Sequence, residues 1–201
     1  MKTSNTIDKN NNVLVLTLSL MNGNYGGILQ AYALQVAIRK SGLNVATDIS
    51  LLNNRRTLRR TLGNIKLQLM RHKSRNEAAF LSTNLINNLI VSKTVRFVHE
   101  NITTVEIFDK KRRPIISTLN NFKYIVVGSD QVWRSTYADI PMYLLDFVRN
   151  SAVKKISYAA SFGKDDLSEY GPKLIKQSAV LAKRFNAVSV REDSGVEISK
   201  K

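Results

Sequence analysis

Cysteine is absent from this 201-residue sequence, and histidine occurs only twice. A disulfide framework, a thiolate metal site and a cysteine nucleophile are therefore excluded. The histidines and acids show neither metal-ligand spacing nor a Ser-His-Asp arrangement, so we expect no metal. The polar start, MKTSNTIDKNNN, has no apolar signal-peptide core. No apolar run approaches the roughly 20 residues that cross a bilayer. We therefore expect a cytoplasmic protein.

Acidic residues are scarce: 15 Asp and Glu stand against 31 Lys and Arg, for a net charge of +16. That balance favours an anionic partner, such as nucleic acid, a membrane surface or a phosphorylated substrate. The excess is concentrated between Asp48 and Glu77, a stretch that contains no acid. Its basic residues are Arg55, Arg56, Arg59, Arg60, Lys66, Arg71, Lys73 and Arg75.

The basic run from Arg55 to Arg75 contains no Phe, Tyr or Trp. Stacking aromatics are typical of single-stranded nucleic-acid sites, so nucleic acid is the less favoured partner. Apolar residues recur at near-helical intervals among the arginines: Leu58, Leu62, Ile65, Leu69 and Met70. This pattern is typical of an interfacial amphipathic helix, which predicts a peripheral contact with the inner, anionic membrane face. A solvated basic face that covers the sheet is the alternative.

Short apolar runs alternate with helical periodicity along the chain. Strands are predicted at 13–18, 44–49, 124–127, 155–160 and 187–190, and helices at 28–40 and 168–185. The stretch 55–100 also has helical character. Alternating strands and helices indicate an α/β fold with a doubly wound, mostly parallel, Rossmann-like sheet. We therefore expect one domain over 1–201, with a basic helical insert at about 53–100.

The loop after the first strand has the sequence NGNYGG. In parallel sheets ligands bind beyond the carboxyl ends of the strands, which is where this loop lies. Asn24 offers a side-chain amide, and Gly26 and Gly27 let a helix start, with its unpaired N–H groups, approach a ligand. A tight strand-to-helix turn would require the same glycines, so both interpretations remain open.

Three more loops follow strands and carry polar residues. GSDQVW holds the only tryptophan, and Ser129, Asp130 and Trp133 together suit a sugar, through a flat apolar face and hydrogen-bonding groups. The alternative is that Trp133 packs on the sheet and Asp130 caps a helix. SFG contributes Ser161 and Gly163.

The last of these loops, RED, follows the fifth predicted strand and contains Arg191 and Glu192. Arginine binds carboxylate and phosphate through a bidentate fork of N–H groups, so Arg191 is a candidate anion ligand. An ion pair between Arg191 and a neighbouring acid is the alternative.

These motifs occur in an order that resembles one family. NYGGILQAYALQ, VVGSDQVW, ISYAASFG and VSVREDSG, which together run from about Asn22 to Gly195, are similar to motifs of the polysaccharide pyruvyl transferases. The resemblance implies transfer of a pyruvyl group from phosphoenolpyruvate to a sugar hydroxyl of a cell-surface polysaccharide or its precursor, without another cofactor. It implies that Arg191 holds the phosphate or carboxylate of the donor. It also implies that the loops at 24–27, 129–133 and 161–163 line a cleft between two Rossmann-like domains, as in glycosyltransferases.

The length differs from that of the family. Family members are about twice as long, and their second half supplies a catalytic histidine and further basic donor-binding residues. The resemblance therefore implies that this chain corresponds to an N-terminal half, and we expect negligible turnover by 1–201 alone. Asp130 or Glu192 could act as a base, but no residue is assigned as the acid. A non-catalytic basic module or remnant that contacts nucleic acid or an anionic membrane is the alternative function.

Overall fold

The computed structural model describes residues 12–50, 89 and 91–200. The basic run at 55–75 lies outside these residues, as does most of the predicted insert. Membrane contact through that run therefore stays a prediction. Within the described ranges, none of the helices has the length and apolar character needed to cross a membrane.

Six parallel strands form one sheet in the order β3-β2-β1-β4-β5-β6. The strands are β1 (Asn12–Leu16), β2 (Asn44–Asp48), β3 (Thr104–Val105), β4 (Tyr124–Asp130), β5 (Lys154–Ala160) and β6 (Ala187–Val190). This confirms the predicted α/β fold. The order is that of a doubly wound Rossmann-like sheet.

β1 shows why the central strands read as unbroken apolar runs. Leu14 and Leu16 belong to the core on one side of the sheet, and Val13 and Val15 belong to the core on the other side. All four side chains are at most 2% exposed. A parallel strand covered on both faces has no polar side, so the apolar residues follow one another without alternation.

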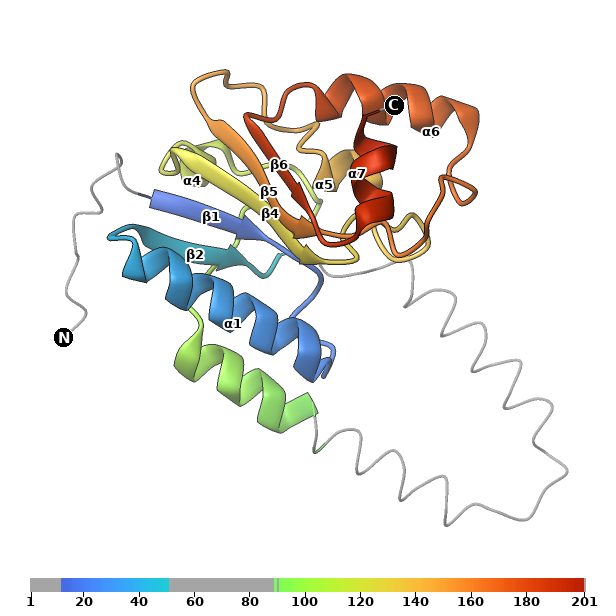
Figure 1. Cartoon of the computed structure of the whole chain (residues 1–201). Helices are drawn as coiled ribbons and strands as arrows, with labels where there is room; N and C mark the ends of the chain where they lie inside the picture. Colours follow the sequence, from blue (N-terminus) through green and yellow to red (C-terminus); the bar gives the residue numbers. More distant parts are fainter. Residues whose placement is uncertain (1–11, 51–88, 90, 201) are drawn as a thin grey trace, which may run out of the picture.

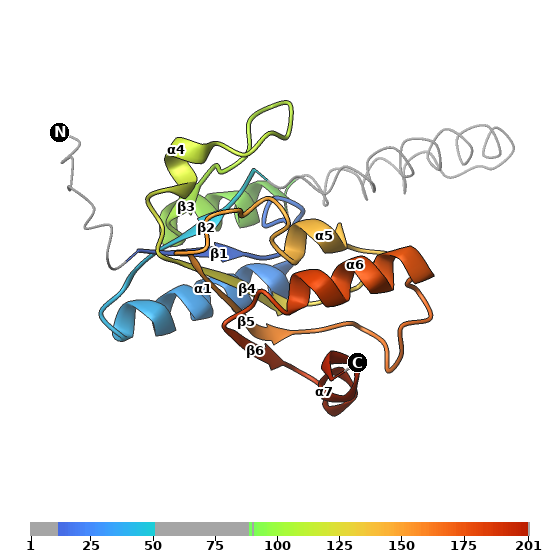
Figure 2. The ribbon, with the colours of Figure 1, turned by 90° about the horizontal axis from the view of Figure 1, so that it is seen from above.

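Helices cover both faces of the sheet (Figures 1 and 2). α1 (Tyr25–Lys40) lies on one face, beside a helix at 91–101 whose Phe97 ring meets the Tyr32 ring edge-on, with the centroids 5.6 Å apart. The helices α4 (Ile116–Leu119), α5 (Ile140–Tyr143) and α6 (Pro172–Ala182) lie on the other face. α7 (Asp193–Ser199) follows β6, near the carboxyl ends of the strands.

The predicted boundaries differ from the observed ones where local residues favour a different start. The helix predicted at 168–185 begins at Pro172, because proline fits the first helical turn, where its missing N–H is not needed. α1 begins three residues earlier than predicted, at Tyr25. β3 has only two residues, and α4 and α5 only four each, which is too short for periodicity to reveal.

Candidate functional site

The site lies between β1 and β4, where the strand order across the sheet changes direction. From β1 the chain continues to β2 and β3 on one side of the sheet, and from β4 to β5 and β6 on the other. β1 and β4 are direct neighbours, with Leu16 paired to Val127. The place between their following loops, at the carboxyl edge, is the crevice in which such sheets usually bind ligands.

Asn24 starts α1 as its N-cap. Its side-chain oxygen accepts a hydrogen bond from the Gly27 N–H at 3.4 Å, so one free donor of the helix start is already used. A Cβ on Gly27 would lie 3.2 Å from the Asn24 amide nitrogen, a tight contact that the Asn24 side chain would have to relieve by a small shift. A Cβ on Gly26 would meet only the Asn24 oxygen, at 3.5 Å. Within the described residues, packing around the Asn24 cap therefore favours glycine at Gly27 and gives no reason for glycine at Gly26.

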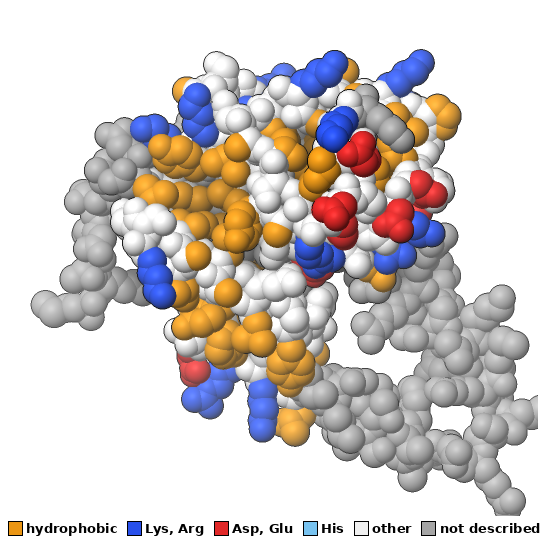
Figure 3. Space-filling model, viewed as in Figure 1, with side chains coloured by type: hydrophobic (Ala, Val, Ile, Leu, Met, Phe, Trp, Pro, Cys, Tyr) orange, Lys and Arg blue, Asp and Glu red, His pale blue; other side chains and the backbone are white. Residues whose placement is uncertain are grey.

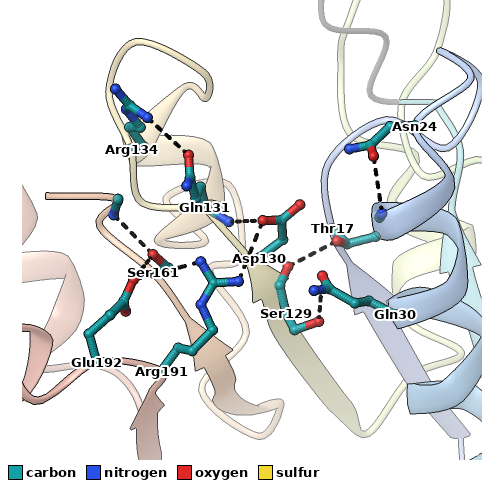
Figure 4. A network of polar contacts seen from close by, with 12 residues as sticks. Thr17, Asn24, Gln30, Ser129, Asp130, Gln131, Arg134, Ser161, Arg191 and Glu192 are labelled. Atoms are coloured by element: carbon teal, nitrogen blue, oxygen red, sulfur yellow. Dashed lines mark hydrogen bonds and ion pairs between the residues drawn. The ribbon is translucent and has the colours of Figure 1, made fainter.

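Ser129 joins the loops of β1 and β4 (Figure 4). Its carbonyl oxygen accepts a hydrogen bond from Thr17 Oγ1 at 3.1 Å, and its hydroxyl donates to Gln30 Oε1 at 3.3 Å. Sequence reasoning missed Thr17 and Gln30. Gln30 lies one helical turn after Gly26, so its spacing could have placed it beside the loop.

Asp130 and Arg191 are brought together from β4 and from the end of β6. Asp130 Oδ1 accepts the Gln131 N–H at 2.8 Å and lies 3.7 Å from Arg191 Nη1. Arg191 Nη2 lies 3.7 Å from Glu192 Oε1. The intramolecular ion pair considered for Arg191 is therefore present.

The Arg191 guanidinium nevertheless keeps its hydrogen-bonding capacity. Both ion-pair distances exceed hydrogen-bond length, and within the described part of the chain its N–H groups form no hydrogen bond. The side chain is 39% exposed. A charged fork with unused donors at the crevice can bind a carboxylate or a phosphate.

Ser161 and Gly163 support the site from the end of β5. Ser161 is fully buried; its hydroxyl donates to Glu192 Oε1 and accepts the Gly163 N–H at 2.9 Å. A Cβ on Gly163 would lie 2.7 Å from Arg134 Cδ. Gly163 therefore permits close packing against Arg134, and Ser161 holds a neighbouring side chain in place.

Trp133 does not offer a face to a sugar. Its side chain is 3% exposed and packs against Phe162 and Phe185, with ring centroids 5.3 and 6.2 Å away. Its ring N–H donates to the Tyr143 carbonyl oxygen at 3.4 Å. The prediction of an exposed aromatic platform is corrected: α5 and α6 cover this face of the sheet and bury the ring in the core.

Two buried tyrosine hydroxyls donate hydrogen bonds to the loops that follow β1 and β4. The Tyr143 hydroxyl donates to the Thr17 carbonyl oxygen at 2.9 Å, and the Tyr170 hydroxyl donates to the Trp133 carbonyl oxygen. Burial raises the pKa of both hydroxyls above the usual 10.0. The folded state therefore favours the protonated hydroxyls.

We expect the free energy of unfolding to fall above about pH 10, because a raised pKa stabilises the fold below the unfolded-state value and this stabilisation is lost as the pH rises. Tyr143→Phe should lower the free energy of unfolding by about 1 kcal/mol at neutral pH. At alkaline pH the free energy of unfolding of this variant should decrease less steeply than that of the wild type. Urea unfolding between about pH 8 and about pH 11 measures both effects. Tyr158, 54% exposed, provides the control, since Tyr158→Phe should follow the wild type. An identical pH slope in Tyr143→Phe would contradict the assignment.

Acidic and basic side chains lie together near the site. Figure 3 shows acidic side chains interspersed with basic ones on the side of this face where α7 lies. Asp193 and Glu197 are exposed residues of α7. Of the two histidines, His99 lies exposed on the helix at 91–101, and His72 falls outside the described ranges. No group of His, Asp and Glu among the described residues is arranged to hold a metal ion.

Comparison with known proteins bears on these motifs directly. The family model described as "Polysaccharide pyruvyl transferase" matches residues 24–201. Searches of the curated proteins and of the solved structures gave no match. The matched range includes every candidate residue, from the Asn24 cap through Asp130 and Ser161 to Arg191 and Glu192. The chain therefore belongs to the polysaccharide pyruvyl transferase family.

Proposed function

We propose that this protein serves in the transfer of a pyruvyl group from phosphoenolpyruvate to a sugar hydroxyl of a cell-surface polysaccharide or its precursor. In this proposal the described residues form one wall of the site. The Arg191 guanidinium carries the proposal, since it is partly exposed at the crevice and has unused donors. Phosphoenolpyruvate presents a carboxylate and a phosphate, the two groups that such a fork binds well.

The chemistry assigns different work to the neighbouring residues. In ketal formation, C2 of the donor bonds to two sugar oxygens, C3 gains a proton and the bond from C2 to the phosphate oxygen breaks. The two hydroxyl protons end on the new methyl group and on the released phosphate. Asp130 is the proposed base for a sugar hydroxyl, because its side chain is 19% exposed at the crevice.

The acid that protonates C3 needs a separate source. The described wall holds no histidine near Arg191, and its carboxylates lie beside a cation. We propose that the acid comes from outside the described residues, as the family resemblance implies through the histidine of its second half. Binding of the donor to this wall is therefore the more direct test than turnover.

The test is calorimetric titration of the protein with phosphoenolpyruvate, and with pyruvate and inorganic phosphate at matched concentrations. We expect a dissociation constant on the order of 1 mM or tighter for phosphoenolpyruvate, and weaker binding of each part, because only the whole donor presents both anionic groups. Arg149→Ala, which removes an exposed cation near the start of β5, should bind the donor as the wild type does. Equal binding of phosphate and phosphoenolpyruvate would rule out a pyruvyl-donor site here.

A further inference from the structure

Glu192 is held in place more firmly than its position at the end of a strand requires. The Ser161 hydroxyl donates to Glu192 Oε1, while the same hydroxyl accepts the Gly163 N–H at 2.9 Å. Ser161 is fully buried, so its hydroxyl is shielded from competing water. A loop from β5 thus fixes a carboxylate that follows β6 (Figure 4).

The two ordinary roles for a glutamate here do not fit its contacts. Glu192 is the N-cap residue of α7, yet its side chain makes no capping hydrogen bond. It is also poorly placed as a base, since Oε1 is engaged by Ser161 and lies 3.7 Å from Arg191 Nη2. Its Oε2 is buried and has no hydrogen-bond partner within the described residues. A base needs an oxygen that can reach the reacting proton.

The carboxylate instead lies against the candidate anion ligand. The Arg191 backbone N–H donates to the Ala160 carbonyl oxygen at 3.0 Å, which ties the start of its side chain to β5. At the other end, Nη1 faces Asp130 Oδ1 and Nη2 faces Glu192 Oε1, each at 3.7 Å. A flat guanidinium between two fixed negative charges has its plane and direction set.

We propose that Glu192 is a positioning residue for Arg191, with Ser161 as its anchor. The inference rests on the proposed function for the identity of the anion that Arg191 binds, and not for the positioning itself. Glu192 orients the guanidinium toward the crevice without using up its hydrogen bonds. The Arg191 guanidinium is therefore already oriented when the donor binds, so Arg191 loses less side-chain conformational entropy on binding.

The variants Glu192→Gln and Ser161→Ala test the proposal. Glutamine keeps the size of the side chain and an acceptor for Ser161, but removes the charge. Alanine removes the anchor alone. Glu197→Gln is the matched control, because Glu197 lies exposed on the same helix and pairs with Lys200 at 2.7 Å. It makes the same change in net charge without touching Arg191.

The first measurement needs no ligand. The side-chain Nε–Hε resonance of Arg191, assigned by its loss in Arg191→Ala, is compared among the variants by NMR. We expect it to shift and broaden in Glu192→Gln and Ser161→Ala, and to stay unchanged in Glu197→Gln. An unchanged resonance in both test variants overturns the proposal. This readout holds even if phosphoenolpyruvate does not bind, in which case the proposed function alone fails.

The second measurement is the affinity for phosphoenolpyruvate, where the sign of the change decides. Removing a negative charge near an anionic ligand strengthens binding if charge alone acts. Loss of positioning weakens it, and we expect about tenfold weaker binding in Glu192→Gln, about 1.4 kcal/mol. Glu197→Gln should match the wild type. Equal or tighter binding in Glu192→Gln would refute positioning of Arg191 for the donor.

Discussion

Gly128→Ala is expected to lower the free energy of unfolding by roughly 3 kcal/mol or more, through backbone strain and a clash. Gly128 has φ of +123° and pairs with Tyr158 of β5. A Cβ there would lie 2.2 Å from the Tyr158 carbonyl oxygen. Because that oxygen belongs to the backbone of a neighbouring strand, it cannot move aside as the end of a flexible side chain can.

Urea unfolding followed by circular dichroism measures this loss, and Gly42→Ala provides the matched control. Gly42 also has a positive φ, of +79°, but apart from its chain neighbours no described residue has an atom within 4 Å of its Cβ position. Its substitution should cost only the backbone term, about 1 kcal/mol. The difference between the two variants then isolates the contact with β5. Equal losses would contradict the clash.

Arg191→Ala is expected to weaken phosphoenolpyruvate binding by about 30-fold, equivalent to about 2 kcal/mol for charge-assisted hydrogen bonds. Its guanidinium N–H groups form no hydrogen bond within the described residues, so a ligand can bind them directly. Arg191→Lys should fall between, because it keeps the charge and loses the planar fork. Calorimetric titration measures all three proteins.

The fold should tolerate the loss of Arg191. Its ion pairs are 3.7 Å long and its side chain is 39% exposed, and such pairs contribute little to stability. The unfolding midpoint of Arg191→Ala should therefore stay close to that of the wild type, while Arg149→Ala leaves both binding and stability unchanged. Donor affinity within a factor of about two of the wild type in Arg191→Ala would exclude this residue as the anion ligand.

The family and the fold class were predictable from the sequence because their evidence is local. β1 is an apolar run buried on both faces, and β6 has the predicted bounds of 187–190. The loops that carry Asp130 and Arg191 could be placed at one edge, since parallel strands end on the same side of a sheet. The distance of 3.7 Å between their side chains agrees with that placement.

Individual side chains were harder to predict when their surroundings come from distant segments. Trp133 follows a strand in sequence as an exposed loop residue would, but α5 and α6 bury it. Asn24 was predicted to offer a side-chain amide to a ligand, and the structure adds that its side-chain oxygen caps α1. Thr17 and Gln30 received no role, because their partner Ser129 lies more than 90 residues away along the chain.

By itself, the sequence determined most of the longer segments that form strands and helices, the family, and the end of the sheet where the polar loops gather. Periodicity and chain order carry that information, because they act over neighbouring residues. Only the tertiary structure decided that Trp133 is core, that Tyr143 supports Thr17, and that Ser161 holds Glu192 against Arg191. Each of these contacts depends on which segments, distant along the chain, pack together when the helices cover the sheet. Burial and hydrogen bonds between such segments leave no pattern among neighbouring residues of the sequence.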